Sequence, residues 1–424
     1  MHLWQDIFEK RRGFWIIAPL MLFYASTYFQ RTALPGTIYD TLAAEFNFTA
    51  AQMATLGAAF VYPYAICQLF SGMLADRFSG ARVAMTGGLL FLAGIFIFPL
   101  CKNPLMLFGA RFITGVGASA MYLSMVKEID RIFGRKIYAV IFGFAYSFGY
   151  VGGLLGTLPF ERLCAHFNWR QVLLCAAGIA LVFYTFFVFG CSRGKLPPIN
   201  AGKFSFSQFT GIFRNPLSWM IIFCCNVNFS AYFIIQTVFG KKFLTDFAGF
   251  SSSGAAAVIF SLTTICILTM LSSTFLTWAT GNRRRPLMRI SSGLCFCSCV
   301  MMSIAMFCDN TPSWIFALVF FLFAASSGMV PIFSMTMQEF NSRSNNALSA
   351  AVNNMFGYLA VAVFSQLTGV LLDSFEKIKM PDGSEIYSPD AYRLLFILIT
   401  ILTGIAFFTA WKIPETQGHY LHLH

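Results

Sequence analysis

Arg31 lies within an apolar stretch of the chain and follows two tyrosines, Tyr24 and Tyr28. In a helix this i, i+4, i+7 spacing places all three side chains on one face. A guanidinium within a membrane costs about 2.5–3.5 kcal/mol on insertion scales, so it normally faces a cavity or a partner. Its fork of N–H donors matches a carboxylate or a phosphate. The pattern predicts an anion site; the alternative is that Arg31 extends to lipid headgroups at the end of its helix.

Other polar side chains occur at helical spacing within further apolar stretches. In the second half of the chain, Asn228, Tyr232 and Gln236 repeat an i, i+4, i+8 pattern. Buried amides and phenols are costly unless they are hydrogen-bonded, so they either bridge helices or line a polar cavity. For the combined set we expect a cavity. Beside Arg31, Tyr24 and Tyr28, its predicted lining residues are Tyr62, Tyr64, Gln68, Tyr146, Tyr150, Asn228, Tyr232, Gln236, Asn354 and Tyr358.

The residue types that enzymes and metal sites use form no recognisable pattern in this sequence. The apolar stretches contain no Ser/His/Asp set, no H-E-x-x-H and no phosphate-binding glycine loop. The twelve cysteines lack metal-ligand spacing, and a disulfide between Cys101 and Cys164 is left open. We therefore expect no enzyme activity, no cofactor and no metal.

The composition of the chain indicates which secondary-structure elements carry these side chains. The 424 residues are 57% hydrophobic and 11% charged, against about 25% charged in an average soluble domain. This composition excludes an ordinary soluble enzyme and an intrinsically disordered protein. Twelve stretches reach the roughly 20 apolar residues that a membrane-spanning helix needs. They lie near 14–34, 52–75, 80–100, 104–126, 138–160, 171–191, 217–240, 253–280, 288–308, 313–337, 346–372 and 392–411. We predict an all-α integral membrane protein with twelve transmembrane helices.

A polar and basic segment in the middle of the chain separates six of these stretches from the other six. We predict an N-terminal six-helix bundle at 1–191, a cytoplasmic linker at 192–216 and a C-terminal six-helix bundle at 217–424. Two pseudo-symmetric bundles of this kind are typical of duplicated transporters.

The formal net charge of +12 is unevenly distributed along the predicted topology. Nineteen of the 29 Lys and Arg lie on the side of the N-terminus, and eight lie on the other side. Cytoplasmic loops carry the excess of Lys and Arg, so both termini are predicted to be cytoplasmic, in a multi-pass protein of the inner or plasma membrane. The excess is an orientation signal and predicts no nucleic-acid partner. The remaining two, Arg31 and Arg111, fall inside spans with no acidic residue at their depth.

Two short motifs carry a resemblance to a known family. The turn between the second and third stretches reads G-M-L-A-D-R-F-S-G-A-R at 72–82, and the fourth stretch contains R-F-I-T-G-V-G at 111–117. With twelve spans and a central basic linker, the whole chain resembles the major facilitator superfamily. The resemblance implies a substrate site between the two halves and a first loop that stabilises one access state. It gives conformational or gating roles to Gly72, Asp76, Arg77, Gly80, Arg82 and Arg111.

The equivalent turn of the second half keeps G-N-R-R-R at 281–285 without the acidic residue. The first stretch, F-Y-A-S-T-Y-F-Q-R at 23–31, and Y-P-Y-A-I-C-Q at 62–68 are similar to the organophosphate/phosphate antiporters and their organic-anion relatives. In that branch an arginine ending the first helix binds the anionic group, which implies this role for Arg31. Those carriers also have a basic residue where this chain has Gln68, and an arginine in the seventh span, which has no charge here. These departures favour a monoanion over a dianionic phosphate ester.

These observations predict a secondary transporter that moves a small organic anion or zwitterion by alternating access. Transport would be coupled to a counter-ion, to protonation of the substrate, or to a peripheral acid such as Glu128, Asp130 or Glu339. Alternatively, transport would be uncoupled. Two alternatives stay open. One is a transporter of an amphipathic drug, lipid or siderophore, and the other is a transporter-like ligand sensor. The expected partners are a small-molecule substrate, with a counter-ion or a proton as a further option, and the lipid bilayer. No nucleic-acid partner is expected, and the protein is predicted to be a monomer.

Overall fold

The computed structural model describes residues 11–133, 135–193, 207–308, 310–341, 346–379 and 385–420. The described chain is almost entirely helical, and ten of its helical segments are long and apolar enough to cross a membrane. The predicted all-α membrane architecture is therefore confirmed. The predicted spans near 14–34 and 138–160 form helices α2 (Arg11–Ala33) and α7 (Arg135–Leu155), which are not among these ten. The count of twelve spans and the pseudo-symmetry stay predictions.

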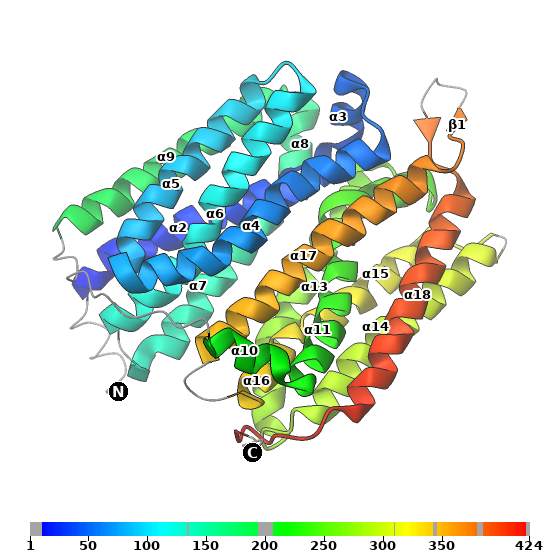
Figure 1. Cartoon of the computed structure of the whole chain (residues 1–424). Helices are drawn as coiled ribbons and strands as arrows, with labels where there is room; N and C mark the ends of the chain where they lie inside the picture. The colour runs from blue at the N-terminus through cyan, green and yellow to red at the C-terminus, as the bar shows by residue number, and fades with distance from the viewer. Residues whose placement is uncertain are drawn as a thin grey trace. The chain divides into compact units, whose positions relative to one another are not determined.

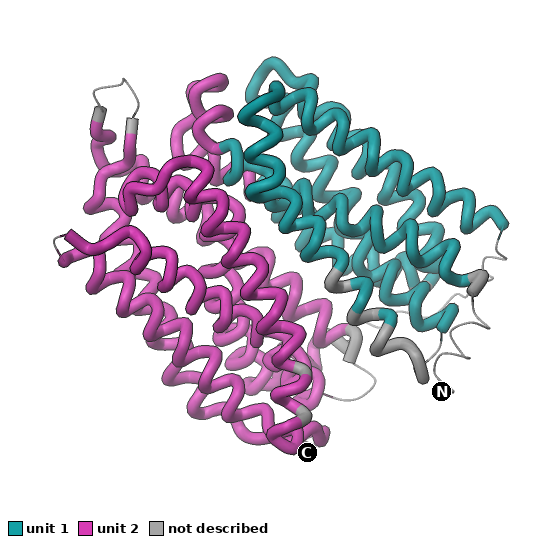
Figure 2. Tube along the Cα trace, turned by 180° about the vertical axis from the view of Figure 1, so that it is seen from behind, with its two compact units in different colours: residues 1–38, 59–204 teal, residues 39–58, 205–424 magenta. Residues whose placement is uncertain are grey.

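Two compact units make up the chain (Figure 2). Unit 1 contains residues 1–38 and 59–204, and unit 2 contains residues 39–58 and 205–424. The segment 39–58 belongs in sequence to the predicted N-terminal bundle but groups with unit 2, and the division falls within helix α4. The predicted boundaries at 191, 192–216 and 217 stay predictions.

Unit 1 consists of long helices joined by short turns (Figure 1). Besides α2, α7 and the part of α4 (Ala50–Phe78) from residue 59 onward, its elements are η1 (Gly36–Ile38), α5 (Gly80–Ile97), η2 (Phe98–Leu100), α6 (Pro104–Phe133), α8 (Leu158–His166) and α9 (Trp169–Arg193).

Close approach of helices in unit 1 depends on glycines. A Cβ at Gly152 of α7 would lie 2.0 Å from the carbonyl oxygen of Ala25 in α2, so a larger residue there would push the two helices apart. A Cβ at Gly117 of α6 would lie 2.2 Å from the backbone nitrogen of Phe91 in α5. Small residues at such crossings let membrane helices pack by van der Waals contact. The α2–α7 crossing brings the tyrosine face of α2 against α7.

Unit 2 holds the remaining elements (Figure 1). They are α3 (Tyr39–Phe46), α10 (Ser207–Arg214), α11 (Pro216–Ile234), the π-helical turn η3 (Ile235–Phe239), α12 (Gly240–Asp246), α13 (Ser252–Ala279), α14 (Arg285–Phe307), α15 (Ser313–Ser327), α16 (Val330–Glu339), α17 (Asn346–Asp373) and α18 (Pro389–Lys412). A two-residue antiparallel hairpin pairs β1 (Ile378–Lys379) with β2 (Glu385–Ile386).

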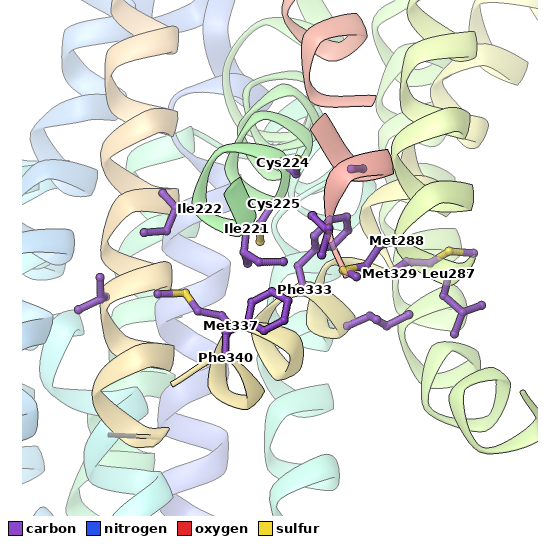
Figure 3. Packing of buried hydrophobic residues seen from close by; sticks show 14 of the residues in the cluster. Ile221, Ile222, Cys224, Cys225, Leu287, Met288, Met329, Phe333, Met337 and Phe340 are labelled. Carbon is purple, nitrogen blue, oxygen red and sulfur yellow. The ribbon is translucent and has the colours of Figure 1, made fainter. Parts of the chain in front are cut away.

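An apolar core joins α11, α14 and α16 within unit 2 (Figure 3). Ile221 and Cys225 of α11, Met288 of α14, and Phe333 and Met337 of α16 are each at most 1% exposed and belong to one cluster. The unbranched Met288 and Met337 and the aromatic Phe333 fill irregular gaps between helices. This core fixes the relative positions of the helices that carry the polar residues of the second half.

Side-chain caps define where several helices begin. Asn215 accepts a hydrogen bond from the backbone N–H of Leu217 at 3.0 Å, with Pro216 at the first position of α11. Ser388 accepts from the N–H of Asp390 at 3.3 Å, with Pro389 at the start of α18. Both arrangements satisfy N–H groups that lack an intrahelical acceptor.

Candidate functional site

Arg31 lies in the last turn of α2 and is only 2% exposed. Its guanidinium carbon lies 4.5 Å from the ring centroids of both Tyr28 and Tyr64, and 5.5 Å from that of Phe60. A cation over an aromatic face is attracted by the ring quadrupole, by about 2 kcal/mol where water is excluded. We call Tyr28, Phe60 and Tyr64 the arginine cage. It contacts the flat faces of the guanidinium, whose N–H groups point outward in the plane of the group.

A chain of tyrosines extends from the arginine cage. Tyr24 donates its hydroxyl hydrogen bond to the Tyr28 hydroxyl at 3.3 Å, and the ring of Tyr28 lies 5.3 Å from that of Tyr150 on α7. The ring of Tyr122 on α6 lies 6.3 Å from that of Tyr24. A Cβ at Gly149 would lie 2.7 Å from the ring of Tyr24, so this glycine makes room for the cluster.

The structure thus brings together six of the predicted site residues of the first half: Tyr24, Tyr28, Arg31, Tyr64, Gln68 and Tyr150. Gln68 is 1% exposed and donates from Nε2 to the Tyr64 hydroxyl at 3.2 Å. Phe60 and Tyr122 were not among the predicted site residues. Phe60 lies four residues before Tyr64 on the same face of α4, and this spacing was the signal that could have identified it.

Two further predicted residues of unit 1 are not placed in this cluster. Tyr62 is half-buried and lies two positions from both Phe60 and Tyr64 on α4, so it points to another face of that helix. Tyr146 belongs to α7, but its side chain lies outside the described residues.

Arg111 of α6 contacts the end of α2 next to the arginine cage. It is 2% exposed, and its two terminal nitrogens donate to the backbone oxygens of Gln30 at 3.0 Å and Leu34 at 3.2 Å. Its guanidinium carbon also lies 4.7 Å from the ring centroid of Phe60. Carbonyls at a helix C-terminus are natural acceptors for a cation. Arg111 therefore fastens α6 to the turn that carries Arg31.

In unit 2, two of the predicted lining residues bridge helices. Asn228 donates from Nδ2 to the hydroxyls of Ser291 at 3.1 Å and Ser326 at 2.7 Å, which joins α11 to α14 and α15. Gln236 donates to the Thr263 hydroxyl at 2.9 Å and so joins the π-helical turn to α13. Such a turn interrupts the regular backbone hydrogen bonds and is frequent at functional sites.

The other predicted residues of the second half lie on α11 and α17. Tyr358 is 4% exposed and packs edge-on against Phe229 at 5.3 Å and Phe233 at 5.8 Å between ring centroids. Tyr232 is 2% exposed, and Asn354 is half-buried.

The glycine-rich turn between α4 and α5 is closed by a carboxylate from α6. Glu128 accepts from the backbone N–H of Ala81 at 2.9 Å and forms an ion pair with Arg131. A Cβ at Gly80 would lie 2.5 Å from the Ser124 carbonyl oxygen, so this position requires glycine. Arg82 donates to the Phe78 carbonyl oxygen at 2.9 Å.

Two more residues of this motif lie against apolar or aromatic side chains. Arg77 lies with its guanidinium carbon 5.3 Å from the Phe78 ring centroid, and Gly72 faces Leu123 of α6. The side chain of Asp76 lies outside the described residues.

An ionic network around a buried lysine in unit 2 was not predicted. Lys242 of α12 is 8% exposed and lies 2.7 Å from an oxygen of Asp40 and 2.9 Å from an oxygen of Asp246. The other oxygen of Asp246 accepts from the Tyr392 hydroxyl at 3.3 Å and from the Tyr387 N–H at 3.1 Å. The i, i+4 spacing of Lys242 and Asp246 was the available signal.

Two phenols complete this network. The hydroxyls of Tyr39 and Tyr387 lie 2.9 Å apart, and burial raises the pKa of both. Both phenols are therefore neutral at physiological pH. The network fastens the 39–58 segment to the rest of unit 2.

The cysteines and potential metal ligands form no further site in the described part of the chain. None of the twelve cysteines, all of which lie in the described part of the chain, forms a disulfide, so Cys101 and Cys164 are not bridged. Among the described residues, no group of three or more His, Cys, Asp or Glu could hold a metal.

Several curated proteins are similar to parts of this chain. Curated relatives include a probable sulfoacetate transporter of Cupriavidus necator, 22% identical over 175 residues (41% of this chain, 40% of the relative). A riboflavin transporter of Clostridioides difficile is 22% identical over 155 residues (36% of this chain, 34% of the relative). A multidrug resistance protein of Salmonella schwarzengrund is 24% identical over 273 residues (62% and 66%). The first of these alignments spans well under half of the relative's length.

Solved structures share the fold over nearly the whole chain. A bacterial homolog of the human lysosomal transporter Spinster superposes with a TM-score of 0.74 at 16% identity, covering 95% of this chain and 97% of that one. A D-xylose–proton symporter superposes with a TM-score of 0.75 at 15% identity, covering 96% and 99%. The sequence profile of the Major Facilitator Superfamily matches residues 20–365. The chain therefore belongs to the Major Facilitator Superfamily, as the motifs at 72–82 and 111–117 predicted.

Proposed function

We propose that the protein is a secondary transporter of a small organic monoanion or zwitterion, and that Arg31 binds the anionic group. The observation that carries this proposal is the arginine cage. Aromatic faces surround a buried guanidinium at the end of α2, with tyrosine hydroxyls and an amide beside it. A guanidinium held by its faces presents its edge to oxygen atoms, and a carboxylate or sulfonate matches that edge.

The charge inventory of the cluster favours one negative charge on the substrate. Gln68 contributes a neutral amide beside Tyr64, where a second basic residue would favour a dianion. Arg111 already donates to two backbone carbonyls and holds α2 in place. The name of one relative, the probable sulfoacetate transporter, is compatible with an organic anion as substrate, but sulfoacetate carries two acidic groups and is therefore not itself a monoanion.

Alternating access of the two predicted six-helix halves is part of the proposal, with the termini in the cytoplasm and the protein monomeric in the inner membrane. Gly72, Asp76, Arg77, Gly80 and Arg82 would stabilise one access state. The contact of Glu128 with the Ala81 N–H and with Arg131 supports this role, because it ties the turn to α6 in the conformation described. Coupling would use a counter-substrate, a proton or a protonated substrate.

The proposal is tested by uptake into proteoliposomes with Arg31→Lys, Arg31→Met and Tyr64→Phe variants. Screening small carboxylates and sulfonates for thermal stabilisation first identifies a ligand, because a ligand stabilises the state that it binds. We expect Arg31→Met to abolish uptake of that ligand and Arg31→Lys to weaken it at least tenfold, because lysine lacks the planar fork. Arg170→Lys is the matched control, since that arginine binds the Pro99 and Cys101 carbonyls away from the cage. Undiminished uptake by both Arg31 variants would refute the assignment.

A second candidate is export of an amphipathic drug-like molecule. The aromatic cluster of Tyr24, Tyr28, Phe60, Tyr122 and Tyr150 offers flat apolar surface, and several curated relatives carry the name multidrug resistance protein. Competition between ligands in the thermal-stabilisation assay distinguishes the anion transporter from the drug transporter. A lipophilic cation that blocks stabilisation by every anion tested, in wild type and Arg31→Met alike, would favour the drug transporter.

A further inference from the structure

Two arginines at the start of α14 converge on one backbone oxygen. Arg285 and Arg289 lie one turn apart, and each donates from a terminal nitrogen to the carbonyl oxygen of Trp411 at 3.1 Å. Trp411 lies in the last turn of α18. The C-terminal end of a helix carries only about half a negative charge, so a single carbonyl leaves most of the charge of the pair uncompensated.

No described carboxylate compensates the pair. The Glu415 carboxylate accepts from the backbone N–H groups of Arg284 and Arg285, and Glu339 is engaged by the side chain of Arg284. Within the described residues, no ion pair involves the Arg285 or Arg289 side chain. The Nε atoms of both arginines are buried and have no hydrogen-bond partner among these residues.

The arginine pair lies at one end of two helices, α14 and α18, that expose apolar side chains. Trp411 is 49% exposed, and its ring lies 4.0 Å from the Arg289 guanidinium carbon. On the same two helices, Ile290 of α14 and Ile405 and Phe408 of α18 are 49%, 51% and 65% exposed. The two helices pack closely, with the rings of Phe296 and Phe407 stacked at 5.8 Å. A tryptophan beside arginines at the end of exposed apolar helices is typical of the membrane interface.

From this arrangement we propose that Arg285, Arg289 and Trp411 bind the headgroup phosphate of an anionic phospholipid whose acyl chains lie along α14 and α18. The two guanidinium forks supply donors to the phosphate oxygens. The carbonyl of Trp411 holds both forks and the indole ring packs against that of Arg289. The exposed side chains of Ile290, Ile405 and Phe408 contact the acyl chains. Basic clusters at the ends of membrane helices recognise anionic headgroups in this way. The site is independent of the transported substrate.

Binding of phosphatidylglycerol to purified protein tests the proposal, measured by native mass spectrometry and by the midpoint of thermal unfolding. Phosphatidylcholine serves as the neutral lipid and inorganic phosphate as the free anion. Each arginine contributes about a fivefold change in affinity for an anionic surface. We therefore expect the double variant R285Q/R289Q to bind phosphatidylglycerol roughly 25-fold more weakly than wild type. Its backbone contacts to Glu415 do not depend on the replaced side chains.

The control double variant K102Q/R162Q removes two exposed charges elsewhere and should bind phosphatidylglycerol like wild type. If R285Q/R289Q does not fold, R285K/R289K keeps the charges without the forks, and we expect several-fold weaker binding. Equal affinity in wild type and in whichever arginine variant folds would overturn the proposal, as would an equal loss in the control. Full competition by millimolar inorganic phosphate would also overturn it, because the site would then bind a free anion.

Discussion

The turns that precede α5 in unit 1 and α14 in unit 2 each follow the second predicted span of a predicted half, but different carboxylates close them. At the first turn, Glu128 at the end of α6 accepts from the N–H of Ala81 and pairs with Arg131. At the second turn, Glu415, which follows α18, accepts from the N–H groups of Arg284 and Arg285. Glu339, in the last turn of α16, pairs with Arg284.

The difference shows that one physical requirement has been met in two ways. The first N–H groups of a helix lack intrahelical acceptors, and a carboxylate is a strong acceptor for them. In unit 1 a single glutamate satisfies the helix start and an arginine together. In unit 2 the two tasks are divided, and the segment after α18 becomes part of the turn. The G-N-R-R-R turn, which lacks the acidic residue of the first motif, obtains its carboxylate from 130 residues further along the chain.

The largest effect is expected from Glu339→Ala. The side chains of Glu339 and Arg284 are 9% and 10% exposed, and Glu339 also accepts from the Thr416 hydroxyl. Removing one partner of a buried ion pair costs about 3–5 kcal/mol because the other charge stays buried. A thiol-reactive dye reports unfolding as buried cysteines such as Cys225 become exposed. The exposed pair of Asp390 and Arg393 provides the control: Asp390→Ala should cost under about 1 kcal/mol.

Glu128→Ala should destabilise the protein less, by about 2–3 kcal/mol. Its partner Arg131 keeps 31% of its side chain exposed and regains water when the carboxylate is removed, although the Ala81 N–H loses its acceptor. The same unfolding assay measures the loss. If Glu128→Ala cost as much as Glu339→Ala, the greater burial of Arg284 compared with Arg131 would not explain the difference between the two turns.

The helices and the glycine-rich turn in this comparison could be predicted from the sequence, because membrane helices follow from apolar length and such turns from short motifs. The helical fold, the motif at 72–82 and the i, i+4, i+7 face of Tyr24, Tyr28 and Arg31 are local patterns. Contacts between residues far apart in the chain leave no such pattern. The pairing of Glu415 with Arg284 and Arg285, and of Asp40 with Lys242, depends on how the chain folds back. Likewise, Asn228 and Gln236 share a helix face, but their hydroxyl partners on α13, α14 and α15 could not be predicted from that face alone.

Glycine substitutions test how tightly the backbone is packed at each of the two turns. A Cβ at Gly80 would lie 2.5 Å from the Ser124 carbonyl oxygen and 3.1 Å from Glu128, whereas Gly281 has open space but a φ of +65°. We expect Gly80→Ala to cost about 2–3 kcal/mol through overpacking. Gly281→Ala should cost about 1 kcal/mol through the left-handed backbone alone. Midpoints of thermal unfolding in one detergent compare the two variants, and a larger shift for Gly281→Ala would show that the second turn is the tighter one.

The smallest effect is expected at Glu415 and depends on pH. Burial alone would raise the pKa of this carboxyl, but backbone N–H donors from Gln417, Arg284, Arg285 and Thr416 together lower it. A carboxyl with a lowered folded-state pKa stabilises the protein fully above its unfolded pKa of about 4.3, and that stabilisation is lost as the pH falls through the folded value.

Glu415→Gln should therefore cost about 1 kcal/mol at pH 7, the usual contribution of a helix cap. The difference between variant and wild type should shrink as the pH falls from 5 to 3, where wild-type Glu415 becomes protonated. Thermal unfolding midpoints across this range measure the difference, with Glu376→Gln, at an exposed position after α17, as the control. A gap that stays constant from pH 7 to pH 3 would mean that the charge of Glu415 does not hold this turn, and that the two turns differ only in their buried ion pairs.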